Sequence, residues 1–257
     1  MPMIDTHCHL DHPVFDADRA AVLARSRQAG VVQWVVPAIR LDNFTAVVAL
    51  RSPALQIALG LHPLFMADHP DGAVAQLAHW VEQVQPLAIG EIGLDAMAPV
   101  ATHPAQRLLF AAQVDLARQV HLPILLHVRK THDAILAVLR QMAFPYGGIV
   151  HAFNGTVQQA QGYLGLGFRL GMGGVVTRER AVRIRQVASV VPEEALVLES
   201  DAPDLPPTGH HGERNEPCHL PLVVHALAEL RQVAPEHIRA ITRANTRMVL
   251  GWPDKEE

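Results

Sequence analysis

The stretch Met3-Ile4-Asp5-Thr6-His7-Cys8-His9 decides how the rest of the chain is interpreted. A short apolar run leads into two histidines that are separated by one residue. Alternate side chains of an extended segment point to the same side, so His7 and His9 can reach one ion while Cys8 faces away. Imidazole nitrogens bind zinc, iron, manganese or nickel, and two of them at the end of a strand supply half of a metal site. Two ordinary histidines in a turn would have the same pattern, so later segments must decide.

Size and composition limit the class of protein. A chain of 257 residues with 49% hydrophobic and 18% charged residues is typical of a globular protein with a large core. A net charge of −4 argues against a broad basic face for long nucleic acid, but not against a local phosphate pocket. The only cysteines, Cys8 and Cys218, indicate no disulfide framework and a reducing, cytoplasmic compartment. No signal-peptide pattern and no run of about 18 apolar residues is present, so we expect no membrane association.

Eight short apolar runs predict strands, and helical patterns follow them along the chain. The expected strands cover residues 3–6, 32–37, 56–60, 87–90, 123–126, 148–150, 168–171 and 196–198. The apolar character of the second run, residues 32–37, is typical of a buried parallel strand. The expected helices for which the pattern sets bounds cover residues 19–29, 41–50, 72–84, 104–120, 132–142, 217–231 and 235–250.

Polar residues follow the expected strands at intervals of whole strand–helix units. Glu91, His127 and His151 directly follow the fourth, fifth and sixth strands, and Asp201 comes shortly after the eighth. Eight such units predict an α/β protein with a TIM-type (β/α)8 barrel, and we expect one domain over residues 1–257. An open doubly wound sheet would spread these side chains along a line, whereas a closed barrel brings them to one rim.

These strand ends supply six candidate ligands of one metal centre, namely His7, His9, Glu91, His127, His151 and Asp201. Four imidazoles and two carboxylates are too many for one tetrahedral ion, but they suit two cations that share a carboxylate or a water. We expect Glu91 to be the bridge, because its two oxygens can be shared. We expect Asp201 to bind metal and also to take the proton from the attacking water. Each residue alone could be structural, but burying six unpaired polar groups at one rim would be costly.

The motifs around these residues resemble those of the TatD family of metal-dependent deoxyribonucleases. They occur in the family's order over nearly the whole chain: Asp5-Thr6-His7-Cys8-His9, Gly60-Leu61-His62-Pro63, Gly90-Glu91-Ile92-Gly93-Leu94-Asp95, His127-Val128-Arg129, His151-Ala152-Phe153-Asn154-Gly155 and Glu199-Ser200-Asp201-Ala202-Pro203. The run from Arg129 to Asp133 is most similar to the YjjV-like branch. The resemblance implies a TIM barrel with two divalent cations (Zn, Mn or Mg). It implies one ion held by His7, His9, Glu91 and Asp201, and another held by Glu91, His127 and His151.

Further residues are expected to contact substrate. The resemblance places His62 at the substrate pocket and Arg214 in the family's Arg-Asn-x-Pro loop, and Arg129 follows His127 closely enough to pair with a phosphate. Family members are described as magnesium-dependent nucleases, including 3′→5′ exonucleases, although a histidine-rich centre suits zinc or manganese better. The chain departs from the family's usual pattern at Leu64 and Ala96, both near the expected substrate mouth.

Three functions stay open at this point. The first is a phosphodiesterase that acts on DNA ends or short oligonucleotides through a water activated by two metals. The second is a hydrolase of a small ester, amide, lactone or aminoacyl ester, and the third is a metal-containing scaffold without turnover. Related barrels that use a carboxylated lysine as the bridge fit poorly, because the chain has only Lys130 and Lys255. No stable protein partner is expected, and the stripe through Gln106 and Gln113 is most simply packing.

Overall fold

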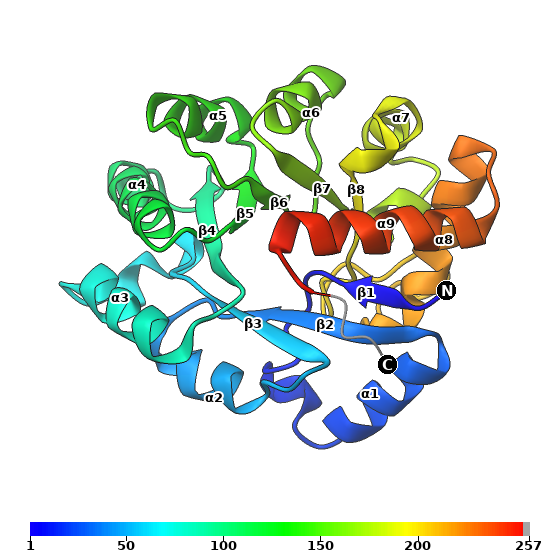
Figure 1. Cartoon of the computed structure of the whole chain (residues 1–257), viewed down its shortest axis with the longest axis horizontal. Helices are drawn as coiled ribbons and strands as arrows, with labels where there is room; N and C mark the ends of the chain where they lie inside the picture. The colour runs from blue at the N-terminus through cyan, green and yellow to red at the C-terminus, as the bar shows by residue number, and fades with distance from the viewer. Residues whose placement is uncertain (254–257) are drawn as a thin grey trace.

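Eight parallel strands form one sheet in the order β1 to β8 in the computed structural model, which describes residues 1–253. The strands are β1 (Met3–Asp5), β2 (Val31–Pro37), β3 (Leu55–Leu59), β4 (Ala88–Asp95), β5 (Ile124–Arg129), β6 (Gly148–Val150), β7 (Phe168–Met172) and β8 (Leu196–Leu198). Each strand pairs in parallel with the next one along the chain. Figure 1 shows the strands at the centre with helices around them. The predicted TIM-type (β/α)8 barrel is confirmed.

Helices cover the outside of the sheet. The α-helices are α1 (Arg19–Gln28), α2 (Phe44–Ala49), α3 (Ala73–Val84), α4 (His103–Gln119), α5 (His132–Gln141), α6 (Val157–Leu164), α7 (Val182–Val190), α8 (Leu220–Arg231) and α9 (Pro235–Leu250). Short 3₁₀ helices are η1 (Pro13–Phe15), η2 (Leu41–Asn43), η3 (Pro63–Asp68), η4 (Val100–Thr102), η5 (Gly174–Thr177), η6 (Glu193–Ala195) and η7 (Pro217–His219). The sequence pattern left the bounds of α6 and α7 unspecified. Within residues 1–253, no helix is both long and apolar enough to span a bilayer.

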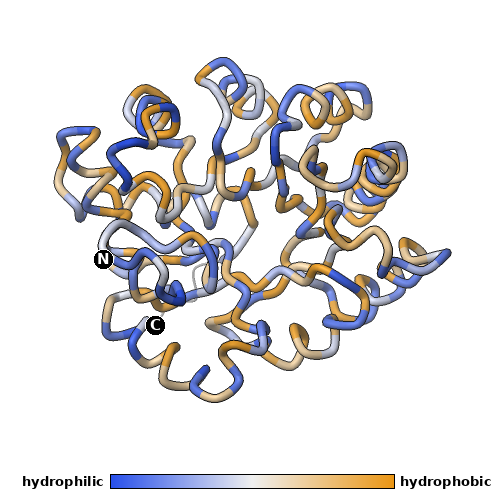
Figure 2. The backbone as a smooth tube through the Cα atoms, turned by 180° about the vertical axis from the view of Figure 1, so that it is seen from behind, coloured by the Kyte–Doolittle hydropathy of each residue, from blue (hydrophilic) through white to orange (hydrophobic). Residues whose placement is uncertain are grey.

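Two apolar layers stabilise this arrangement. The larger lies between strands and helices, and Trp34 belongs to it, with its indole N–H donating to Ser26 Oγ at 3.1 Å. The smaller layer fills the inside of the barrel and consists of Ile4, Val35, Ala58, Ala88, Leu125, Ile149 and Val197. Helix α9 packs against β8 and β1, and Leu250 and Trp252 at its end complete this layer. Burying one such aliphatic side chain contributes about 1.5–3 kcal/mol. Figure 2 shows helices that carry both hydrophobic and hydrophilic stretches, as expected for helices with one buried face.

The two ends of the sheet meet at the seam between β8 and β1. The Thr6 amide and hydroxyl both donate to the Leu198 carbonyl at 2.9 Å, and the Asp201 amide donates to the His7 carbonyl at 2.9 Å. These bonds hold the segment after β1 against the segment after β8. The first histidine pair and the last expected carboxylate are therefore neighbours, although almost the whole chain separates them.

The fourth and fifth strands are longer than the sequence predicted. All residues of β4 are buried, and the strand continues from Glu91 to Asp95 instead of ending at Gly90. In the sequence, the carboxylate of Glu91 resembled the end of a strand. In the structure, β4 continues past Glu91 and pairs with β5, with Gly93 opposite His127. A Cβ on Gly93 would lie 1.9 Å from the His127 carbonyl oxygen, and its φ is +157°. Only glycine allows the two strands to approach this closely, so Glu91 and His127 lie inside strands.

Candidate metal centre

All six expected ligands meet at the carboxyl-terminal rim of the barrel, together with His62. Their donor atoms form three sets in which all atoms lie within 4.8 Å of one another: His7, His9 and Asp201; His7, Glu91 and His151; and His62, Glu91 and His127. The elements that supply them are the segments after β1, β3, β6 and β8 and the strands β4 and β5. Parallel strands in a barrel end at the same rim, and this geometry brings distant segments into one cluster.

Glu91 lies at the middle of the cluster, and its two oxygens face different imidazoles. Oε2 is 3.1 Å from His7 Nε2, whereas Oε1 is 3.1 Å from His127 Nδ1 and 3.3 Å from His62 Nε2. Burial would raise the pKa of Glu91, but the facing His62 and His7 and the hydrogen bond from His127 outweigh burial and hold it well below its usual value. Glu91 is therefore an ionised carboxylate with one oxygen available to each side.

Asp201 closes the cluster on the side of β8. Its Oδ1 is 3.5 Å from His151 Nε2 and 3.8 Å from His9 Nε2. Burial raises its pKa to about 6, against the opposing effect of His151 and His9. The Asp201 side chain is 13% exposed and the Glu91 side chain only 3%, so Asp201 is the more accessible carboxylate for a water molecule. Its φ of +57° is unusual for a residue with a side chain and is typical of functional sites.

Asp95 supports His127 from behind, a role that the sequence did not assign. Because Gly93 pairs with His127, the flanking Glu91 and Asp95 reach the two ring nitrogens, and His127 Nε2–H donates to Asp95 Oδ2 at 3.0 Å. Burial lowers the pKa of His127, but hydrogen bonds to Asp95 and Glu91 outweigh it and raise the pKa. The sequence could have indicated this role of Asp95, because residues 91 and 95 are four apart and lie on the same side of a strand that includes both.

Glu199 supports His151 in a similar way. Its Oε1 lies 3.1 Å from His151 Nδ1 as an ion-pair contact and accepts the Ala152 amide at 2.6 Å. Burial opposes a charge on His151, but Glu199 and Asp201 raise its pKa to about 10. A Cβ on Gly171 would lie 2.0 Å from Glu199 Oε2, so glycine leaves the space for this side chain. Carboxylates behind ligand imidazoles are typical of metal sites, because they set the tautomer and the ring orientation.

Three features of the cluster fit divalent cations. Glu199 Oε2 is buried without a hydrogen-bond partner. His7 Nε2 and His9 Nε2 converge to 3.3 Å, and the His7 ring stacks on His151 with centroids 3.6 Å apart. Burial and the neighbouring His151 lower the pKa of His7 well below its usual value, so it is a neutral imidazole. Convergent imidazole nitrogens beside carboxylates are the donors that zinc and manganese accept.

Two of the expected substrate residues lie at the cluster. His62 is buried and lines a cavity with His9, Glu91 and Asp201, which places it among the metal donors as well as at the cavity. Arg129, the last residue of β5, is exposed and lines an adjoining cavity that also contains His127 and His151. The substrate roles of both residues stay predictions.

Arg214 has protein partners that the sequence did not indicate. Its guanidinium donates to both carboxylate oxygens of Asp18 at 2.8 Å and to Glu216 at 2.6 Å, and it lies over the Phe15 ring. These hydrogen bonds raise its pKa further above the usual value. The arginine fastens the loop after β8 to the segment before α1, and its contact with substrate stays a prediction.

The glutamines of α4 do more than pack. Gln113 accepts the Leu61 amide at 2.8 Å and donates to the Leu61 carbonyl at 3.0 Å. Gln106 accepts the Asp95 amide at 2.9 Å. Both side chains are buried, and they fix the backbone beside His62 and Asp95. The helical stripe predicted their burial but not these bonds.

We expect Asp95→Asn to weaken metal binding. The amide cannot accept charge-assisted hydrogen bonds from His127 as the carboxylate does, so the ring loses its fixed orientation. Such a change typically lowers metal affinity or activity about 10–100-fold. The affinity can be measured by competition with a chromogenic chelator. Asp133→Asn is the control, because Asp133 accepts from Gln159 Nε2, at 3.0 Å, instead of from a histidine of the cluster. Equal affinities in the two variants would show that Asp95 does not position His127.

Comparison with known proteins shows which family the chain belongs to. Residues 4–251 match the TatD related DNase family. The chain is 39% identical to the uncharacterized metal-dependent hydrolase YjjV of Escherichia coli (strain K12), with 97% of this chain and 98% of that protein covered. It is 34% identical to a protein of Pantoea sp. (strain At-9b) named 3'-5' ssDNA/RNA exonuclease TatD, with 96% and 98% covered. The crystal structure of YjjV, a TatD homologue from Escherichia coli K12, superposes with a TM-score of 0.94 over 98% of each chain.

The barrel, the cluster of donors at its rim and these relatives define the class, which is a metal-dependent hydrolase built on a (β/α)8 barrel. Within that class, the chain belongs to the TatD related DNase family. The family resemblance predicted from the motifs is confirmed.

Proposed function

We propose that this chain is a phosphodiesterase that acts on DNA ends or short oligonucleotides, with 3′→5′ exonuclease action, through two divalent cations. The position of Glu91 carries the proposal, because its two oxygens face two separate sets of imidazoles. The relatives named as ssDNA/RNA exonucleases support nucleic acid as the substrate class. The single domain, the cytoplasmic location and the absence of a stable protein partner stay predictions from the sequence.

The chain's own residues divide the work. His7, His9, Glu91 and Asp201 would hold one cation, and Glu91, His127 and His151 would hold the other. Bound cations of Zn, Mn or Mg would supply an activated water and neutralise the charge that develops on the phosphoryl oxygens. His62 lies 3.3 Å from Glu91 Oε1, so it can either join the second set of donors or contact substrate there.

Proton transfer and substrate orientation fall to residues at the edge of the cluster. Asp201 accepts the proton of the attacking water, since it is the more exposed of the two carboxylates. Arg129, at the wall of the adjoining cavity, pairs with the phosphate of the strand. The imidazoles of His127 and His151 hold position because Asp95 and Glu199 lie behind them.

The direct test combines metal analysis with a substrate panel. Protein purified without added metal is analysed for bound elements, and Mg²⁺, Mn²⁺ and Zn²⁺ are then added singly to single-stranded DNA, a carboxyl ester and a lactone. We expect release of mononucleotides from the 3′ end, much faster than turnover of the other substrates. Hydrolysis of the ester or lactone alone would replace the proposal with the small-ester function. Tightly bound metal without any turnover would support the scaffold function.

A further inference from the structure

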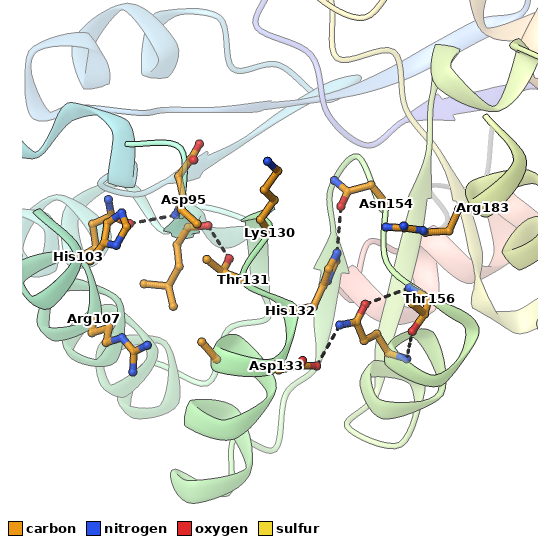
Figure 3. Close-up of a pocket in the computed structure, with 15 residues that line it drawn as sticks. Asp95, His103, Arg107, Lys130, Thr131, His132, Asp133, Asn154, Thr156 and Arg183 are labelled. Atoms are coloured by element: carbon orange, nitrogen blue, oxygen red, sulfur yellow. Dashed lines mark hydrogen bonds between the residues drawn. The ribbon is translucent and has the colours of Figure 1, made fainter. Parts of the chain in front are cut away.

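A second cavity of about 460 Å³ lies beside the metal centre, between the start of α4 and the loops that lead into α5 and α6. Figure 3 shows this cavity with its lining side chains. Arg107 of α4 and Arg183 of α7 approach from opposite sides, and Lys130, which follows β5, lies between them. No bound metal is needed to form this cavity, because none of the metal donors lines it.

The cations of this cavity outnumber its carboxylates, because Arg107, Lys130 and Arg183 line it together with Asp95 and Asp133. Arg107, Lys130 and Arg183 are exposed, and none of them makes a hydrogen bond or ion pair with another residue of the described part, 1–253. The two carboxylates of the wall make no ion pair with these three cations. Asp95 accepts from His127 and from the Met97 amide, and Asp133 accepts from Gln159. The cavity therefore has an excess of positive charge, although the whole chain carries a net charge of −4.

The cavity adjoins the metal centre. Asp95 lines it and has its Oδ2 3.0 Å from His127 Nε2. Asn154 lines both this cavity and the neighbouring one, which contains His127, Arg129 and Asp201. A polymer with one end at the metal centre can thus pass along the rim and reach Lys130.

We propose that this cavity binds phosphates of a single-stranded nucleic acid beyond the nucleotide that is being removed. This inference rests on the proposed phosphodiesterase function and adds where the rest of the strand lies. Unpaired arginine and lysine side chains along a groove are typical of sequence-independent contacts to a phosphate backbone.

The test uses three neutral substitutions, Arg107→Gln, Lys130→Gln and Arg183→Gln, combined in one variant. Arg27→Gln is a control for the loss of a single exposed arginine, because Arg27 is exposed and lies over the Trp34 ring near the end of α1, at the opposite end of the barrel. Two substrates are compared with the same metal: single-stranded DNA of about ten nucleotides and bis(4-nitrophenyl) phosphate, which has a single phosphate and therefore no further phosphate for the cavity to bind. Binding of the labelled DNA is measured in parallel by fluorescence anisotropy at several salt concentrations.

For the DNA, we expect the triple variant to raise KM and weaken binding about tenfold or more. The log–log salt slope should fall by about 0.7 for each phosphate that the protein no longer neutralises. Turnover of the small diester should stay at the wild-type level, which also shows that the variant folds. Equal DNA binding and KM in the triple and control variants would overturn the cavity inference alone. If neither substrate were hydrolysed with any metal, the proposed function would fail, and the anisotropy measurement would still decide whether the cavity binds DNA.

Discussion

The substitution Glu91→Gln should lower kcat for single-stranded DNA on the order of 10³-fold or more, because metal-ion catalysis contributes several kcal/mol. Glutamine keeps the size of the side chain but removes the charge that faces His7 on one side and His62 and His127 on the other. One amide oxygen cannot serve both sides. We therefore also expect the content of bound metal to fall from about two equivalents per chain to one or fewer.

Elemental analysis and steady-state kinetics on the same preparations measure both effects. Glu82→Gln is the control, because Glu82 lies exposed on α3 and loses the same charge away from the cluster. A Glu91→Gln variant that kept two equivalents of metal and its rate would show that Glu91 does not bridge two cations. Normal metal content with a large loss of rate would instead assign Glu91 to the chemistry.

The substitution Asp201→Asn should have the second largest effect, a loss of about 10²–10⁴-fold in kcat, which is the usual contribution of a general base. The amide cannot accept the proton of the attacking water. Metal binding should weaken less than in the Glu91 variant, because the three histidines near Asp201 Oδ1 remain. The result to measure is therefore a fall in kcat that exceeds the fall in metal content.

The pH profile separates a base from a simple ligand. Burial raises the pKa of Asp201 to about 6 in the metal-free protein, and a nearby dication favours the carboxylate and moves this value down. The base is active above this lowered pKa, so wild-type kcat should fall as the pH drops below about 6. Asp201→Asn should lack this acid limb. Asp42→Asn is the control, because Asp42 lines the same cavity but pairs with Arg40 at 3.0 Å.

Much of the barrel could be predicted from the sequence because its signals are local. Continuous apolar runs such as residues 32–37 mark buried parallel strands, and each strand's position depends mainly on its own residues. The six donors were found because polar residues follow such runs, at one rim of any closed barrel. The predicted lengths of β4 and β5 were wrong, because a buried carboxylate or imidazole resembles the end of a strand until the neighbouring strand is known.

The sequence by itself determined the eight-unit barrel, the family and the residues that form the cluster. Only the tertiary structure decided how they are grouped: that Glu91 faces two sets of imidazoles, that Asp95 and Glu199 lie behind His127 and His151, and that Asp18 holds Arg214. It also brought Arg107, Lys130 and Arg183 to one cavity. The reason is that side-chain alternation and burial are set within a few neighbouring residues, whereas these contacts depend on strand register and on the packing of segments far apart in the chain.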